Sequence, residues 1–180
     1  RHVVIMGMGY VGFTLALVLA DRGFQTTGVD VDQTKIDALQ QGKSYIHERG
    51  LDELFKRQLN QNFNPSTEMP DDGDVYIISV GTPVVKKDKD SMPVPDLTAL
   101  QNVATVIGKN LERGNLVVLR STVPVGTTRD FVLPILEKES GLKGGRDFHL
   151  SFAPERTAEG KAVKELRELP QIIGGINEES

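Results

Sequence analysis

The chain begins with a short apolar run that leads directly into a glycine-rich turn. Residues 3–6 read Val-Val-Ile-Met, residues 7–12 read Gly-Met-Gly-Tyr-Val-Gly, and residues 13–20 continue as an apolar stretch with helical period. A buried strand, a Gly-x-Gly-x-x-Gly turn and a helix N-terminus in this order are what a dinucleotide pyrophosphate requires. Gly7 permits the tight turn, Gly9 removes the side chain that would block the phosphates, and Gly12 lets the helix pack close to the strand.

A second apolar run, residues 24–29, ends in Asp30, at the distance from the glycines where this fingerprint has its acidic residue. A carboxylate there accepts hydrogen bonds from the 2′- and 3′-hydroxyls of the adenosine ribose and repels a 2′-phosphate, so NAD is favoured over NADP. Alternatively, Asp30 and Asp32 cap the helix that follows. Lys35 lies one turn into that helix, where its spacing fits a contact with the ribose or the adenine edge and equally fits a solvated helix lysine.

Strand and helix patterns alternate along the chain, which predicts right-handed βαβ units and a parallel sheet. The pattern predicts strands at 2–7, 24–30, 75–80, 116–120, 148–152 and 171–174, and helices at 10–22, 33–41, 50–60, 97–111, 126–139 and 160–168. The predicted fold is therefore α/β: a Rossmann-type, doubly wound, mainly parallel sheet with helices on both faces. We expect residues 1–180 to form one NAD-binding domain of this type.

Composition narrows the classes of function. Hydrophobic residues make up 38% of the 180 residues, enough for a two-sided α/β core, and the net charge of −4 gives no reason to expect nucleic acid or an anionic membrane as a partner. No stretch approaches the roughly 20 apolar residues of a membrane span, and we expect no signal peptide because the first strand begins at once. The absence of cysteine and three scattered histidines argue against a disulfide or a metal site. A cytoplasmic protein is the expectation.

Three further segments follow predicted strands, at the carboxyl ends of the strands, where ligands bind in this fold. They read Ser-Val-Gly-Thr-Pro at 79–83, Arg-Ser-Thr-Val-Pro-Val-Gly-Thr-Thr at 120–128, and Ala-Pro-Glu-Arg-Thr-Ala-Glu-Gly at 153–160. Glycine lets the backbone approach a ligand, and the threonines offer hydroxyl groups. Taken singly, the second segment also fits a turn with a helix cap, and the third a solvated charged turn. The polar segment 86–95 predicts a mobile surface loop, with a lid over the cofactor as the alternative.

Taken together, these segments resemble the UDP-glucose/GDP-mannose dehydrogenase family over essentially all 180 residues. The shared motifs, in order, are Gly-x-Gly-Tyr-Val-Gly at 7–12, Gly-Val-Asp-Val-Asp at 28–32, Ser-Val-Gly-Thr-Pro at 79–83, Ser-Thr-Val-Pro-Val-Gly-Thr at 121–127, Pro-Glu-Arg at 154–156 and Ile-Ile-Gly-Gly at 172–175. The Ser-Thr-Val-Pro-Val-Gly element is the most specific, because generic nicotinamide-binding domains lack it. Members of this family oxidise the C6 alcohol of a nucleotide-linked sugar to a carboxylate with two NAD.

The resemblance implies a role for each matching residue. Residues implied to bind NAD are Gly7, Gly9, Tyr10, Val11, Gly12, Asp30, Lys35, Gly81, Thr82, Ser121, Thr122 and Glu159, the last near the nicotinamide ribose. Glu155 resembles the family's acid/base glutamate, which with Thr122 positions the water that releases the acid product. A neighbouring hydroxyl and shielding by bound cofactor are expected to raise the pKa of this carboxyl. Glu155, Arg156 and Thr157 are implied to line the nucleotide-sugar substrate. No metal ligand is implied.

The arginine after Pro-Glu replaces the Phe-Leu of the UDP-glucose branch and resembles the branch that acts on N-acetylated hexosamines such as UDP-N-acetylmannosamine. Family members also carry a central helix and a second domain, which supply a lysine, an asparagine and a nucleophilic cysteine with its aspartate. None of these can be placed in this chain. We therefore expect it to be the N-terminal, cofactor-binding part of a larger enzyme, which forms a homodimer through the central helix and is inactive without the second domain.

Two alternatives come from other classes of protein. One is another NAD-dependent dehydrogenase, of the β-hydroxyacid or 3-hydroxyacyl-CoA type, which would have a helical second domain with a catalytic lysine or histidine. Such an enzyme is not expected to carry the Thr122 and Glu155 elements. The other is a non-enzymatic NAD-binding module that senses cofactor occupancy.

Overall fold

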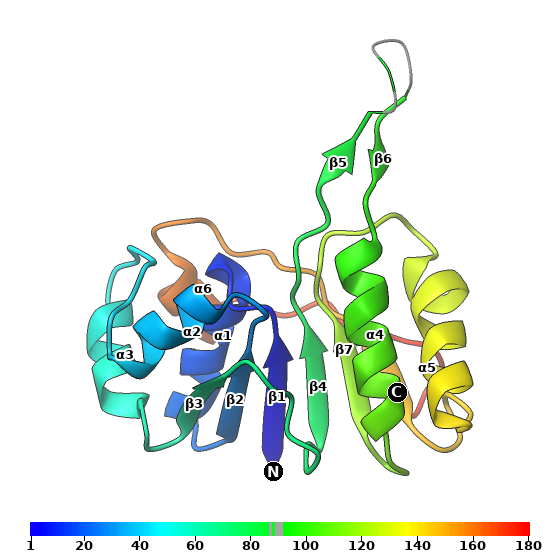
Figure 1. Ribbon diagram of the computed structural model, residues 1–180, viewed down its shortest axis with the longest axis horizontal. Coiled ribbons are helices and arrows are strands. Elements are labelled where there is room, and N and C mark those ends of the chain that lie inside the picture. Colours follow the sequence, from blue (N-terminus) through cyan, green and yellow to red (C-terminus); the bar gives the residue numbers. More distant parts are fainter. Residues whose placement is uncertain (87, 89–91) are drawn as a thin grey trace.

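The computed structural model describes residues 1–86, 88 and 92–180 of the chain. In this part of the chain, seven strands form one sheet in the order β3-β2-β1-β4-β7-β8-β9 (Figure 1). The strands are β1 (His2–Met6), β2 (Gln25–Val29), β3 (Phe63–Ser66), β4 (Val75–Ile78), β7 (Leu116–Leu119), β8 (His149–Phe152) and β9 (Gly174–Gly175). All neighbours are parallel except β8 and β9, which are antiparallel. The predicted doubly wound, mainly parallel α/β fold is confirmed.

The strand order reverses between β1 and β4. The chain runs outward from β1 through β2 to β3, then returns to the other side of β1 to form β4 and continues through β7 and β8. In register, Met6 at the end of β1 lies opposite Val29 in β2 and Ile78 in β4. The loops that leave β1 and β4 therefore diverge to opposite faces of the sheet, which leaves a crevice at the carboxyl ends of these strands. This is where ligands bind in open α/β sheets.

Helices cover both faces of the sheet. They are α1 (Tyr10–Asp21), α2 (Gln33–Gln40), α3 (Leu51–Gln58), α4 (Thr98–Asn110), α5 (Leu133–Ser140) and α6 (Ala162–Glu168). Val3 and Ile5 of β1 pack into one core with apolar residues of α1, α2, α3 and α6, whereas Val4 and Met6 pack into the other with those of α4 and α5. Burial on both faces explains why β1 reads as a continuous apolar run rather than an alternating one.

Several boundaries differ from those predicted. Strand β3 was not predicted: it contains Asn64 and Pro65, and it is tolerated because it lies at the edge of the sheet, where a missing N–H breaks no inner ladder. The last strand, predicted at 171–174, is Gly174–Gly175. The helix predicted at 126–139 begins as a π-helical segment, Thr127–Val132, before α5.

A two-stranded hairpin, β5 (Val84–Val85) and β6 (Val94–Pro95), extends away from the body of the domain beyond the carboxyl ends of the sheet (Figure 1). The loop predicted at 86–95 thus has antiparallel strands at its base, and residues 87 and 89–91 lie outside the described part of the chain. Among the described residues, no helix is long and apolar enough to cross a membrane.

Candidate cofactor-binding and active site

The glycine turn between β1 and α1 has the geometry that its sequence predicts. Gly7 has a φ of 104°, and its N–H donates to the carbonyl of Val29 at 2.7 Å. A Cβ on Gly12 would lie 1.9 Å from the carbonyl oxygen of Gly7, so the first turn of α1 packs directly on the turn. A Cβ on Gly9 would instead meet no described atom within 4 Å. Helix α1 has no side-chain cap among the described residues, so its N-terminal N–H groups remain available to an anion.

Asp30 at the end of β2 binds the glycine turn rather than capping α2. Its Oδ2 accepts from the N–H of Met8 at 2.8 Å, and its Oδ1 accepts from the N–H of Asp32 at 3.0 Å. Helix α2 is capped by Asp32, whose Oδ1 accepts from the N–H groups of Thr34 and Lys35. The capping alternative therefore holds for Asp32 and not for Asp30.

Lys35 turns back toward the same carboxylate. Its Nζ lies 3.4 Å from Oδ2 of Asp30, and its side chain is 39% exposed. The ammonium group therefore sits at the end of β2 beside Asp30 rather than extending freely into solvent. This places a cation and an anion together where the fingerprint has the adenosine ribose.

Two clefts meet at the glycine turn. The first has a volume of about 470 Å³ and reaches from the turn past Asp30 and Lys35 to one face of α4. The second, of about 270 Å³, reaches from the turn to the ends of β4, β7 and β8, where Thr122 and Glu155 lie. Gly9, Ser79, Val80 and Gly81 line both clefts. The result is a continuous hollow across the switch point, with the open N-terminus of α1 in its middle.

Hydroxyl groups at the ends of β4 and β7 tie these two strands together. The buried Ser121 donates through Oγ to the carbonyl of Val80 at 2.7 Å, and Thr82 donates through Oγ1 to the carbonyl of Thr122. Thr122 itself is exposed and lines the smaller cleft. Ser121 and Thr82 therefore fix the backbone around the cleft, while Thr122 presents its surface to whatever occupies it.

Tyr10 connects the glycine turn to two distant loops. Its hydroxyl donates to Glu48, in the loop between α2 and α3, and the N–H of Gly160 donates to the same Glu48 oxygen at 2.7 Å. Burial and the hydrogen bond to Glu48 raise the pKa of Tyr10 to about 12. The tyrosine ring lines the smaller cleft, so one side chain both borders the hollow and holds the segment after Glu155 against the turn.

Glu155 forms an ion pair with the buried Arg120 at the end of β7. The guanidinium Nη2 lies 2.7 Å from Glu155 Oε2, and the two side chains are 5% and 15% exposed. Burial raises the pKa of the Glu155 carboxyl, but the N–H of Thr157 and the Arg120 guanidinium outweigh it, so the pKa lies below its ordinary value. In the free protein the pKa of Glu155 is therefore not raised, because Arg120, which the sequence expectation did not include, lies beside the carboxyl. The raised pKa expected with bound cofactor stays a prediction.

Not every predicted site residue lies in the hollow. Gly7, Gly9, Tyr10, Val11, Asp30, Lys35, Gly81, Thr82, Ser121, Thr122 and Glu155 line one cleft or both, and Gly12 lies directly beneath the turn. Arg156, Thr157 and Glu159 line neither cleft. The Arg156 guanidinium donates to the carbonyl of Pro170 at 3.0 Å. Among the described residues, no group of three or more His, Cys, Asp or Glu is placed to hold a metal ion.

Sequence reasoning missed the residues of α4 that complete the larger cleft. These are Ala99, Asn102 and Val103, one turn apart on the helix that follows the β5–β6 hairpin. Their spacing is that of an ordinary helix face, so nothing local marks them as lining residues. Only the packing of α4 beside the end of β4 brings them there.

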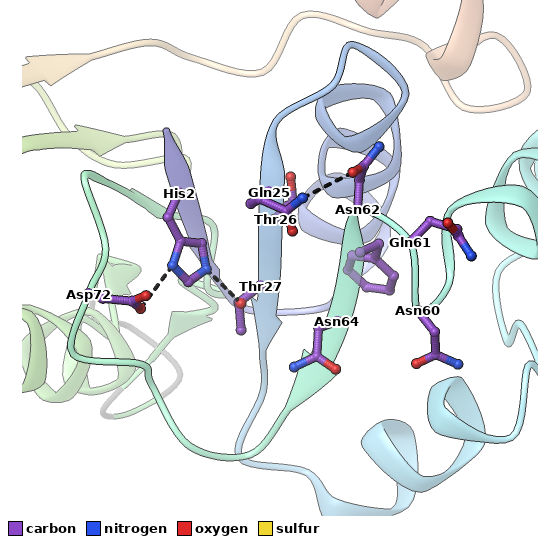
Figure 2. Close-up of a pocket in the computed structure, with 10 residues that line it drawn as sticks. His2, Gln25, Thr26, Thr27, Asn60, Gln61, Asn62, Asn64 and Asp72 are labelled. Atoms are coloured by element: carbon purple, nitrogen blue, oxygen red, sulfur yellow. Dashed lines mark hydrogen bonds and ion pairs between the residues drawn. The ribbon is translucent and has the colours of Figure 1, made fainter.

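A further hollow of about 450 Å³ lies at the amino ends of the strands, where β1, β2 and β3 begin (Figure 2). Its walls are rich in amide side chains, and the His2 imidazole bridges Asp72 and Thr27 at 2.9 and 2.8 Å. It contains none of the predicted site residues. It also lies at the amino ends of the parallel strands, away from the switch point.

The hollow at the switch point fits NAD. An unobstructed helix N-terminus faces its centre, an acidic residue with a neighbouring lysine borders one arm, and hydroxyl and carboxylate groups border the other. Residues at the glycine turn would hold the pyrophosphate and Asp30 the adenosine ribose, which leaves the nicotinamide arm beside Thr122 and Glu155. The fold and the site together define a dinucleotide-binding domain of the kind found in NAD-dependent dehydrogenases.

More narrowly, the chain belongs to the UDP-glucose/GDP-mannose dehydrogenase family: the model of that family's NAD binding domain matches residues 1–180. It is 34% identical to UDP-N-acetyl-D-mannosamine dehydrogenase of Campylobacter jejuni, over 99% of this chain and 44% of that protein. A solved structure of the Pyrococcus horikoshii UDP-D-ManNAc dehydrogenase superposes with a TM-score of 0.92 at 32% identity, and covers 99% of this chain and 42% of that one.

GDP-mannose dehydrogenase from Pseudomonas aeruginosa is similarly close, with a TM-score of 0.89 and 37% identity over 99% of this chain and 42% of that one. The chain thus spans less than half the length of these relatives. Within the family, it corresponds to the NAD binding domain.

Proposed function

We propose that this chain is the N-terminal, cofactor-binding domain, residues 1–180, of an enzyme that oxidises the C6 alcohol of a UDP-N-acetylhexosamine to the uronate with two NAD. The observation that carries the proposal is that Thr122 and Glu155 share one cleft of about 270 Å³ with Gly9 and Tyr10 of the glycine turn. A hydroxyl and a carboxylate thus border the arm of the hollow in which the nicotinamide would lie. The family match and the NAD site support the same reaction class.

In this proposal the bound cofactor and the residues of the smaller cleft have distinct chemical tasks. Bound NAD supplies the hydride acceptor for both oxidations. Thr122 and Glu155 hold a water molecule against the substrate's C6 after the second oxidation, when C6 is a thioester on a cysteine of the second domain. The Glu155 carboxylate takes a proton from that water as its oxygen attacks C6 and the thiolate leaves. This chain contains no cysteine, so the thiolate has to come from elsewhere in the enzyme.

The choice of substrate rests on the segment after Glu155 and on the names of the relatives. Arg156 is exposed and its guanidinium donates to the Pro170 carbonyl, and neither Arg156 nor Thr157 lines the two clefts. Relatives at 34 to 36% identity include enzymes named for UDP-N-acetyl-D-mannosamine and for NDP-N-acetyl-D-galactosaminuronic acid. We propose UDP-N-acetylmannosamine or a related UDP-N-acetylhexosamine as the substrate, with Arg156 and Thr157 along the sugar or the diphosphate and Glu159 near the nicotinamide ribose.

The rest of the enzyme is part of the proposal. A central helix would form the homodimer, and a second domain would supply the opposite wall of the substrate site. The cytoplasmic location expected from the sequence stays a prediction. In this proposal Glu155, Arg156 and Thr157 would form only one wall of the substrate site. The 180-residue chain should therefore bind NAD without turning over a nucleotide sugar, since a half-site neither excludes water nor orients the C6 hydroxyl.

Two preparations test the proposal: the 180-residue chain and the longer protein that carries it. Each is incubated with NAD and, in turn, UDP-N-acetylmannosamine, UDP-glucose and GDP-mannose, and NADH is followed by absorbance. We expect NADH from the longer protein with the first sugar, at two per sugar consumed, and none from the 180-residue chain. NADH with GDP-mannose alone would overturn the substrate assignment. NAD binding with no turnover of any nucleotide sugar by the longer protein would favour a cofactor-sensing module.

A further inference from the structure

Arg120 is a buried cation whose donors are concentrated on one carboxylate. It follows the last residue of β7, its backbone N–H donates to the Ile78 carbonyl of β4, and its side chain is 5% exposed. Nε and Nη2 both donate to Glu155 Oε2, at 3.2 and 2.7 Å, and Nη1 donates to the Ala153 carbonyl at 3.3 Å. A guanidinium this deeply buried is stable only with such partners, so its position is fixed by Glu155 and by the end of β8.

The other oxygen of Glu155 is also fully engaged. Oε1 accepts from the backbone N–H groups of Arg156 and Thr157, both at 2.7 Å. A carboxylate has about four lone-pair sites, and here four N–H donors address them, two on each oxygen. In this arrangement Glu155 is ionised, fixed in rotation, and has no lone pair left for a water molecule. Accepting a proton therefore requires one donor to withdraw.

We propose that Arg120 is the positioning residue for Glu155: it holds the carboxylate ionised and oriented along the cleft, and its Nε–H, the longest of the four contacts, withdraws when Glu155 accepts a proton from water. The inference rests on the function proposed above for Glu155. Arg120 also lines the smaller cleft with Glu155, so an occupant of the cleft meets both members of the ion pair.

The surroundings of Glu155 offer no second cation in contact with it among the described residues. The Arg156 guanidinium is directed to the Pro170 carbonyl, and Gln171, which approaches Arg120 Nη1 at 3.5 Å, is neutral. Tyr10, across the cleft, has a pKa of about 12 and is neutral at physiological pH. Burial by itself raises the pKa of Glu155, and Arg120 with the Thr157 N–H reverses that sign. Removing the guanidinium should therefore raise the pKa of this carboxyl.

The first experiment measures the ionisation of Glu155 in the 180-residue chain, without reference to catalysis. The chain is labelled with 13C at the glutamate carboxyl carbon, the Glu155 resonance is assigned with Glu155→Gln, and its shift is followed as the pH is lowered. In Arg120→Met we expect Glu155 to titrate at a higher pH than in the unsubstituted chain, with Arg120→Lys in between because a lysine keeps the charge but not the two-pronged contact. The matched control is Arg129→Met, which removes an exposed arginine that donates to the Ile176 carbonyl.

Equal titration of Glu155 in Arg120→Met and the unsubstituted chain would overturn the proposal. If Arg120→Met does not fold, Arg120→Gln, which keeps hydrogen-bond donors without the charge, has the same expected sign and the same refuting outcome.

The second experiment uses the longer protein and the pH dependence of kcat. The rate should fall on the acid side as Glu155 becomes protonated, and in Arg120→Met this fall should occur at higher pH, with partial rescue by Arg120→Lys and little change in KM for the nucleotide sugar. A purely structural role for Arg120 would instead lower kcat by the same factor at every pH, and that result would refute the proposal. If the unsubstituted longer protein turns over no nucleotide sugar, the proposed function fails, while the titration of Glu155 still decides the role of Arg120.

Discussion

Removing the Asp30 carboxylate should weaken NAD binding, and it also removes the acceptor of the Met8 N–H in the glycine turn. In the free protein, three donors address this carboxylate: the Met8 N–H at 2.8 Å, the Asp32 N–H at 3.0 Å and Lys35 Nζ at 3.4 Å. Since a carboxylate has about four lone-pair sites, one is free for a ribose hydroxyl, and a second becomes free if Lys35 moves. Asp30→Ala removes both and leaves the bound ribose hydroxyls without an acceptor.

The magnitude follows from the number of hydrogen bonds lost. One hydrogen bond to a charged acceptor is worth about 1.5–3 kcal/mol, and water reaches part of this site because the Asp30 side chain is 11% exposed. We therefore expect a loss of about 1–3 kcal/mol, or roughly 5- to 150-fold in Kd. The preference for NAD over NADP should also shrink, because the carboxylate that repels a 2′-phosphate is gone.

Calorimetric titration of the 180-residue chain with NAD and with NADP measures both effects. The matched control is Asp32→Ala, two residues away, which removes the cap of α2. This control should lose about 1 kcal/mol of stability and keep its affinity for NAD. Unchanged NAD affinity in Asp30→Ala, or equal affinity of the unsubstituted chain for NAD and NADP, would refute the assignment of Asp30 to the ribose.

Three further predictions use the same structure. Gly9→Ala should keep its melting temperature, because its Cβ meets no described atom within 4 Å, yet bind NAD at least about tenfold more weakly. Gly12→Ala, whose Cβ would lie 1.9 Å from the Gly7 oxygen, should instead lose at least about 1–3 kcal/mol of stability. The opposite pattern in thermal melts and NAD titrations would contradict these two expectations. Glu155→Gln in the longer protein should slow turnover roughly 10²- to 10⁴-fold and leave the affinity for NAD unchanged. Sugar should stay covalently trapped on this variant, which intact mass would detect. Turnover at the unsubstituted rate would exclude Glu155 as the base. The Arg146 side chain and the Lys143 N–H hold the pKa of Asp147 well below its usual value. This carboxylate therefore stabilises the fold above its unfolded pKa of about 3.9, and the contribution is lost as the pH falls below that. Urea denaturation should show Asp147→Asn less stable than the unsubstituted chain at pH 7, with the difference in unfolding free energy narrowing toward pH 3; a constant difference would contradict this pH dependence.

The features that the sequence predicted well are those set by neighbours along the chain. The strand, turn and helix at 2–22 follow from hydrophobic period and from three glycines whose steric roles are local. The alternation of strands and helices then predicts a parallel sheet, and this sheet brings Asp30, Thr82 and Thr122 together at the carboxyl ends of its strands. Strand β3 was missed because its pairing with β2 at the edge of the sheet, and not its own Asn-Pro composition, makes it a strand.

The features that the sequence did not predict depend on side chains far apart in the chain. Glu48 and Gly160 meet at the Tyr10 hydroxyl although they are 112 residues apart, and Arg120 meets Glu155 across 35 residues.

The Arg120 contact helps to decide the direction in which the pKa of Glu155 is shifted. Burial alone raises this pKa, and the guanidinium and the Thr157 N–H lower it. Arg120 was visible in the sequence directly before Ser121 and Thr122, but a single arginine at a strand end is ordinarily solvated. Only the parallel pairing of β7 with β8 places it beside the carboxylate. The base of the proposed hydrolytic step is therefore ionised in the free protein because of tertiary structure, and its activation depends on displacing one of the four donors that surround it.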